Sequence, residues 1–405
     1  MTTGRGERTW EFKARFRRNA FGWRSQPAIL RVKEAVGEIK RVVRKDPVLA
    51  AEGAVTFLER VSPALERVDS SSGAIGTAVN RAIAELVPII AKAPADARTR
   101  DVWLERLYEA HRADEIPYIE QLTDYWGELC ASEETASAWA DRLLWVTRMA
   151  LGQDRSMRGH FHAASACLSS LFRAERFEEL LSVLEAESFW HYKRWAVKAL
   201  AAMGRPDEAI QCAESCRSPW APDADIDRTC EEILHSLGRV DEAYRRYGVR
   251  APREGTYLAS FRAMCGRYRG KPPSGILADL VAATPGSEGK WFAAAKDAGL
   301  YEEALVLARH TPCDPRTLTR AARDLAEKEP AFAVEAGVLA VHWLLEGHGY
   351  EITGADVLAA CSQTLKAAEK LGRVSQIREK IREMAGAREG EIAGLILEWM
   401  GQRRV

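Results

Sequence analysis

The sequence predicts an all-α protein, an α-solenoid built from antiparallel helical hairpins. Three observations support this fold: helical spacing of apolar residues in most segments, few strand signals, and a repeated turn in the second half. Alternating β-branched runs do not occur, and no Asn-Gly or Asp-Gly pair separates two apolar runs. With 47% hydrophobic residues and twelve Trp, the chain can bury a core.

Residues 1–50 are expected to form a basic, aromatic-rich N-terminal arm followed by the first helix. The helix is predicted over residues 27–45, where apolar side chains recur every three or four positions at Ile29, Val32, Val36, Ile39 and Val43. Pro27 suits a helix start, and Asp46-Pro47 ends the helix because a residue before proline avoids the α region.

Residues 51–155 are expected to form the helical N-terminal half of the solenoid. A loop is predicted at residues 69–73, which read DSSSG, and a helix at residues 76–92. Two or three further helices, rich in Trp, are expected between residues 101 and 150.

A repeated turn marks residues 156–390, before a C-terminal helix end and tail at 391–405. Three segments align on one glycine: AAMGRPDEAI at Gly204, HSLGRVDEAY at Gly238 and KDAGLYEEAL at Gly299. Glycine accepts the left-handed conformation that ends a helix, and the acidic residues favour the N-terminus of the next. We therefore expect each glycine between two antiparallel helices, with a buried alanine one turn later at Ala209, Ala243 and Ala304. Degenerate copies occur at Glu175 and Gly372.

These segments resemble the tetratricopeptide repeat. The likeness rests on the 34 residues from Gly204 to Gly238 and on the Gly-x-x-acidic-Glu-Ala turn. The first helices depart from the family's pattern at most aromatic and glycine positions, so we describe the repeats as tetratricopeptide-like.

A second resemblance covers most of the chain, from about residue 16 to residue 386. The phrases that carry it are FRRNAFGWRSQPAI, DPVLAAEGAVTFLE, DSSSGAIG, YWGELCAS, TPGSEGKWFAAAK, TPCDPRTLTRAARD and GHGYEITGADVL. They look like a bacterial family of helical-repeat proteins that is carried as a domain of unknown function. The resemblance implies a helical solenoid and transfers no catalytic residues.

Signatures of catalysis and of cofactor binding are missing from the sequence. The nearest string to a phosphate loop, Gly286 to Trp291, is too short and lacks the hydroxyl residue, and no Gly-x-Ser-x-Gly occurs. His160-x-His162 and the pair Cys212 and Cys216 could each form one edge of a metal site. Without a C-x-x-C or H-E-x-x-H motif, we interpret the cysteines as small buried hydrophobes. We expect no enzyme activity, cofactor, metal or small-molecule substrate.

The N-terminal sequence and the cysteines favour a bacterial cytoplasmic protein. Charges and aromatics fill the first 23 residues, which excludes a secretory signal peptide, and no run of 18 apolar residues indicates a membrane span. The eight cysteines are scattered singly, which is typical of reduced thiols. Abundant Arg and Ala suggest a bacterial genome rich in GC.

Local charge imbalance gives the strongest functional signal, although the formal net charge is zero. Residues 1–50 hold thirteen cations against five anions, and residues 244–273 hold eight against one. Aromatic residues are interleaved in both segments. Residues 101–134 are acidic, with ten anions against two cations.

Two classes of partner fit this pattern. The first reading is a non-catalytic scaffold that binds a protein or peptide, since Arg pairs equally well with carboxylates. The alternative is nucleic-acid binding by segments 10–45 and 244–273, where cations neutralise phosphates and aromatic rings stack on bases. The candidate partner-binding residues are Arg15, Arg17, Arg18, Trp23, Arg24, Arg245, Arg246, Tyr247, Arg250, Arg262, Arg267, Tyr268, Arg269 and Lys271.

Overall fold

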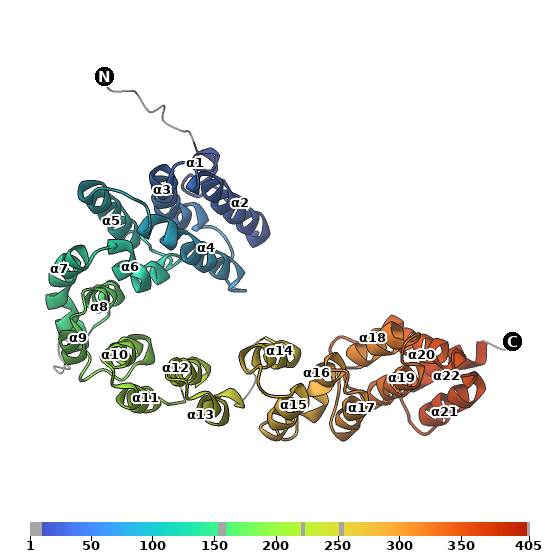
Figure 1. Ribbon diagram of the computed structural model, residues 1–405. Helices are drawn as coiled ribbons and strands as arrows, with labels where there is room; N and C mark the ends of the chain where they lie inside the picture. The colour runs from blue at the N-terminus through green and yellow to red at the C-terminus, as the bar shows by residue number, and fades with distance from the viewer. Residues whose placement is uncertain (1–9, 153–158, 220–222, 251–254, 403–405) are drawn as a thin grey trace. The chain divides into compact units, whose positions relative to one another are not determined.

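Only helices, turns and loops occur in the described part of the computed structural model (Figure 1), which confirms the all-α prediction. The structure describes residues 10–152, 159–219, 223–250 and 255–402. Contacts divide the chain into unit 1, Met1–Ile226, and unit 2, Asp227–Val405. The predicted divisions at residues 50, 155 and 390 stay predictions.

Unit 1 begins with five helices whose long members pack in neighbouring pairs, as α2 packs on α3 and α4. Its described helices are α1 (Glu11–Arg15), α2 (Ser25–Val43), α3 (Pro47–Leu65), α4 (Ala74–Ala91), α5 (Ala97–Arg112), the 3-10 helix η1 (Glu120–Tyr125), α6 (Trp126–Cys130), α7 (Glu133–Leu151), α8 (Ala164–Arg173), α9 (Phe177–Val183), α10 (Trp190–Ala202) and α11 (Pro206–Glu214). The predicted helix at 27–45 is α2, and the break at Asp46-Pro47 is the start of α3, whose first turn Asp46 caps through Leu49 N.

Unit 2 contains the later repeats. Its helices are α12 (Asp223–Ser236, which begins in unit 1), α13 (Val240–Ala243), the π-helical turn η2 (Tyr244–Gly248), α14 (Tyr257–Arg267), α15 (Pro273–Ala282), the 3-10 helix η3 (Glu288–Trp291), α16 (Phe292–Asp297), α17 (Tyr301–His310), α18 (Pro315–Leu325), α19 (Pro330–Leu345), α20 (Gly354–Glu369), α21 (Val374–Gly386) and α22 (Glu391–Gln402). In Figure 1, α14 and α18 lie along one edge of this unit, and α13, α15 and α17 lie along the other.

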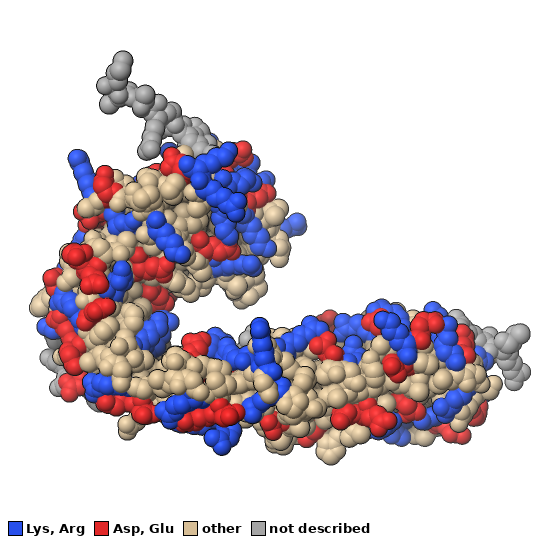
Figure 2. Space-filling model, viewed as in Figure 1, with Lys and Arg blue, Asp and Glu red and all other residues tan. Residues whose placement is uncertain are grey.

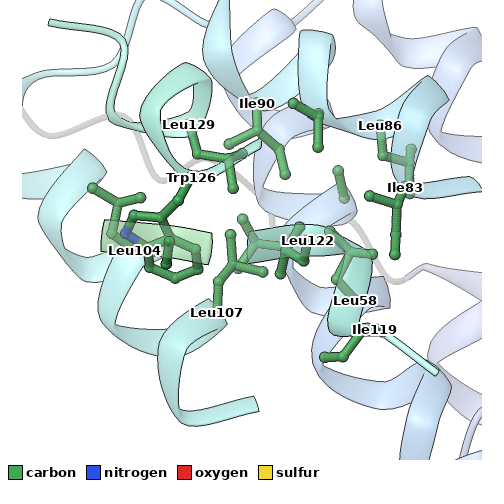
Figure 3. Packing of buried hydrophobic residues seen from close by; sticks show 14 of the residues in the cluster. Leu58, Ile83, Leu86, Ile90, Leu104, Leu107, Ile119, Leu122, Trp126 and Leu129 are labelled. Atoms are coloured by element: carbon green, nitrogen blue, oxygen red, sulfur yellow. The ribbon is translucent and has the colours of Figure 1, made fainter. Parts of the chain in front are cut away.

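Each unit has its own hydrophobic core. Figure 3 shows part of the core of unit 1, where leucine and isoleucine side chains from α3, α4, α5 and α6 pack together and Trp126 lies beside Leu104. Helix α4 is the only described helix that is long and apolar enough to span a membrane by composition. It contributes Ile83, Leu86 and Ile90 to this core, so we interpret it as a core helix.

The repeated turn has the predicted geometry. Gly204, Gly238 and Gly299 each lie between two helices with positive φ angles of 74°, 72° and 74°. Ala209, Ala243 and Ala304, the alanines one turn later, are fully buried at 0% exposure. Gly372 repeats the conformation with φ 66°. The turn prediction is therefore confirmed.

Glu175, in the glycine position of a degenerate copy, adopts the same left-handed conformation with φ 55°. A residue with a Cβ atom is strained there by roughly 1–2 kcal/mol. We therefore expect Glu175→Gly to raise the free energy of unfolding by about 1 kcal/mol in urea denaturation, net of the backbone entropy that glycine loses. The matched control is Gly204→Ala, where a Cβ would contact nothing and only backbone strain changes. It should lose about 1 kcal/mol. A loss of stability in Glu175→Gly, or a gain in Gly204→Ala, would refute a purely conformational cause.

Candidate partner-binding surfaces

The cations of segment 244–273 are mostly exposed on η2, α14 and the loop before α15. Five of them form ion pairs with carboxylates from outside the segment, which are Arg246 with Glu242, Arg250 with Asp227, Arg262 with Asp297, Arg267 with Glu231 and Lys271 with Asp241. Arg253 lies outside the described residues. Arg245 and Arg269 form no ion pair in the described part of the chain, and Arg269 donates to the Gly266 carbonyl.

Two of these ion pairs reach acids buried on α12. The distance from Arg250 Nη1 to Asp227 Oδ1 is 2.9 Å, and from Arg267 Nη1 to Glu231 Oε2 it is 2.5 Å. The side chains of Asp227 and Glu231 are only 6% and 1% exposed. A buried carboxylate needs a compensating charge or hydrogen bond. The fold therefore uses Arg250 and Arg267 itself, although both are among the candidate partner-binding residues.

The aromatic residues of the same segment belong to the core of unit 2. Tyr244, Tyr247, Phe261 and Tyr268 are all buried. The Tyr268 hydroxyl donates to Glu231, and the Tyr244 hydroxyl donates to Asp279 Oδ2 at 2.6 Å. Tyr247 and Tyr268 therefore do not supply the exposed rings that the sequence suggested, because their apolar bodies fill the space between helices.

The N-terminal segment also buries its aromatics from residue 10 onwards. Trp10, Phe12 and Phe16 are at most 4% exposed and pack with Phe57 of α3. Glu38 of α2 holds α1 in place by accepting the N–H groups of Glu11 and Phe12. The expected arm is thus folded onto α2 and α3 in its described part. Only Trp23, 72% exposed, presents a whole ring to solvent.

Unlike segment 244–273, the surface of α1 and α2 keeps many unpaired cations. Figure 2 shows Lys and Arg gathered over these two helices. Arg15 pairs with Glu11 and Glu34, and Arg18 pairs with Glu66. Seven exposed cations form no ion pair within the described residues, namely Lys13, Arg17, Arg24, Lys33, Arg41, Arg44 and Lys45. We call these seven residues the α1–α2 basic face.

The acidic segment 101–134 pairs within unit 1. Its carboxylates include Glu105, which pairs with Arg142 of α7, and Asp124, which pairs with Arg194 of α10 at 2.5 Å. Arg106, a cation within the segment, bridges Glu52 and Glu59 of α3. Within the described residues, three of the ten acids of the segment form ion pairs, namely Glu105, Glu109 and Asp124, so the segment is only partly neutralised.

A groove between α15 and α17 was not anticipated from the sequence. It is open, has a volume of about 540 Å³ and is lined by Ser274, Leu277, Ala278, Val281, Leu300, Glu302, Glu303, Val306 and Leu307. Val306 is 61% exposed although it is apolar. Glu302 and Glu303 are exposed and form no ion pair within the described residues. The groove combines an apolar floor with a negative rim.

The candidate metal ligands are dispersed. No group of three or more potential ligands comes together among the described residues. The His162 carbonyl oxygen contacts His111 Nε2 at 3.1 Å, and the Cys216 thiol donates to the Cys212 carbonyl oxygen. All eight cysteines are free, and burial raises the pKa of the Cys167 thiol to about 11. Such a thiol stays protonated at neutral pH and is a poor ligand or nucleophile.

Comparison with known proteins adds no family assignment. No protein-family model matches the chain, and no curated protein matches it.

Proposed function

We propose that this protein is a non-catalytic helical-repeat scaffold that binds a protein or peptide partner in the cytoplasm, and that the α15–α17 groove is its docking site. The observation that carries the proposal is the partly exposed apolar lining of this groove, with Val306 61% exposed, beside two carboxylates that form no ion pair within the described residues. Isolated exposed apolar residues are ordinary on protein surfaces, whereas an apolar groove with a polar rim is typical of an interaction site.

The chemistry of the groove defines its occupant as an amphipathic helix that carries Lys or Arg beside its apolar stripe. Leu277 and Val281 are one helical turn apart on α15, and Val306 and Leu307 face the groove from α17. A helix that lies in such a groove offers apolar anchors three or four residues apart. Glu302 and Glu303 lie in the first turn of α17, where their negative charges stabilise the helix N-terminus. In that position their carboxylate oxygens can also bind a cation of the peptide.

The alternative function, nucleic-acid binding through segments 10–45 and 244–273 together, has less support. In the second segment the cations pair with acids of the same unit and the tyrosines are buried. The aromatic stacking that favours single-stranded nucleic acid therefore has no platform there.

The proposal is tested with helical peptides selected from a display library against the full-length protein. Selected sequences should combine leucine-like anchors with Lys or Arg. In a fluorescence-anisotropy titration of one such peptide, Val306→Arg should weaken binding at least tenfold, about 1.4 kcal/mol, by filling the groove with a cation. The matched control is Val102→Arg, at a half-exposed valine on α5, and it should leave the affinity unchanged.

Two results would contradict this function. The first is equal peptide affinity for wild type and Val306→Arg. The second is selection of acidic peptides that bind elsewhere.

As a test of the negative rim, replacing Glu302 and Glu303 by Gln should weaken peptide binding and reduce its salt dependence, because the removed charges act at long range.

A further inference from the structure

Three unpaired cations among the described residues lie along the solvent-facing side of α2. Lys33, Arg41 and Arg44 recur eight and three residues apart, which places them on one helix face. The opposite face carries the buried residues Val32 and Ile39. The stripe that these three cations form is therefore a solvent surface, and its cations belong to the unpaired α1–α2 basic face.

Gly37 interrupts this stripe in the middle of α2. Glycine inside a helix costs roughly 0.5–1 kcal/mol relative to alanine. No packing reason accounts for it, because a Cβ atom at this position would contact nothing within 4 Å. Between Lys33 and Arg41, at Gly37, an open hollow of about 550 Å³ lies between α1 and α2. Arg15 and Arg31 line this hollow together with Glu11, Glu34 and Glu38, so its charge is mixed. A partner can approach the helix backbone closely at this point.

We propose that the α1–α2 basic face binds the phosphate backbone of duplex DNA without reading its sequence. Protein interfaces usually have an apolar core from which charged residues are depleted. This face has the opposite character, since seven unpaired cations cover a surface whose exposed large apolar residues are Trp23 and Leu30. Phosphates are bound by charge alone, and releasing their counterions supplies the affinity.

The dimensions of the stripe favour B-form DNA. Lys33 and Arg44 are eleven residues apart, or roughly 16 Å along the helix axis. The major groove of B-DNA is about 12 Å wide, so cations at the two ends of the stripe can reach phosphates on both sides of it. The major groove of A-form RNA is narrow, and single strands would require several stacking rings, whereas Trp10, Phe12 and Phe16 are buried and Trp23 is the exposed ring beside this face in its described part.

The test is a fluorescence-anisotropy titration of the full-length protein with a duplex DNA of arbitrary sequence over a range of salt concentrations. Each phosphate contact contributes about 0.9 to the slope of log K against log salt. We expect a slope of roughly −4 to −6, and similar affinity for an unrelated duplex. A variant with Gln at Lys33, Arg41, Arg44 and Lys45 should lose at least tenfold in affinity at low salt, and its slope should be reduced by roughly three to four.

A matched control removes the same charge from unit 2. It carries Gln at Arg245, Arg269, Lys328 and Lys380, four exposed cations that form no ion pair among the described residues. The affinity of this control variant for DNA should remain within about twofold of the wild-type affinity, and its salt slope should be unchanged.

Gly37→Glu should weaken DNA binding several-fold while the melting temperature stays at or above that of the wild type, because the side chain has room. Thermal unfolding verifies that each variant is folded.

Three outcomes would overturn the proposal: equal losses in the α2 variant and its control, no salt-dependent binding by the wild type, or tighter binding to phosphatidylserine vesicles or polyglutamate than to DNA. The last would indicate a membrane or an acidic protein as the partner. The proposal is independent of the peptide groove, because Val306→Arg should bind DNA as the wild type does.

Discussion

Replacing Arg100 by Met is expected to lower the free energy of unfolding by about 3–5 kcal/mol, the largest effect of any single change considered for this protein. Arg100 on α5 is only 7% exposed. Its guanidinium donates to the carbonyl oxygens of Ile90 at 3.2 Å, Ala93 at 2.9 Å and Leu129 at 3.1 Å. It thereby ties the end of α4 to the end of α6, and burial lowers its pKa.

The expected loss follows from the three charge-assisted hydrogen bonds that Met removes. The Ile90 and Ala93 carbonyls keep the backbone N–H donors of Ala93 and Ala95, whereas the Leu129 carbonyl loses its side-chain donor. A hydrogen bond to a charged group contributes about 1.5–3 kcal/mol, and a buried unsatisfied acceptor costs more than an exposed one. Arg100→Lys should also be strongly destabilising, because an ammonium group cannot reproduce the planar fork. Urea denaturation followed by circular dichroism measures both variants. The control is Arg98→Met, at an exposed position on the same helix; a loss as small as the control's would contradict this account of Arg100.

The second large effect is expected for Arg267→Ala, which should cost about 2–4 kcal/mol by leaving Glu231 buried without its ion pair. Glu231 is 1% exposed, and its remaining contacts include the Tyr268 hydroxyl. Exposed ion pairs contribute little, but removing a cation from a buried carboxylate is costly.

A double variant separates the ion pair from the packing. Replacing Arg267 by Leu and Glu231 by Leu removes both charges, and should recover most of the stability lost in Arg267→Ala. Arg269→Ala, two residues away and exposed, should change stability by less than about 0.5 kcal/mol. If Arg267→Ala is as stable as Arg269→Ala, Arg267 does not stabilise the fold. The sequence-based prediction that Arg267 binds a partner then regains support.

The fold could be predicted because its rules are local. A glycine that ends one helix, two acids that begin the next and a small alanine at the crossing occur within ten residues of sequence. The structure places Gly238 and Ala243 as those rules require. Glu175 shows that the conformation of the turn is kept even where the residue is unfavourable.

The candidate sites were less predictable because charge balance is decided in space. Segment 244–273 has one acid of its own, yet Asp227 and Asp297 reach it from helices on either side. A count along the sequence cannot include partners that lie 23 or 35 residues away. The same limit applies to aromatics, since Phe12 and Tyr268 are next to cations in sequence but face the core.

The α15–α17 groove was missed for a related reason. Val281 and Leu307 are apolar residues within predicted helices, and the sequence does not distinguish an apolar side chain that is fully buried from one left partly uncovered. Exposure of Val306 becomes visible only when the neighbouring helices are placed. The basic face on α2 was partly predicted, since Arg17 and Arg24 were among the candidates, whereas Lys33 and Arg44 were not.

The most direct test of the peptide-binding function is photo-crosslinking from inside the groove. A photoreactive phenylalanine derivative is placed at Val306, or at Val102 as the control, in the full-length protein with a selected helical peptide bound. Mass spectrometry then identifies the adducts. Binding in the groove predicts covalent peptide adducts from position 306, competed by excess unlabelled peptide, and none above background from position 102. Equal adducts from both positions, or none from 306 under conditions where the peptide is bound, would contradict it.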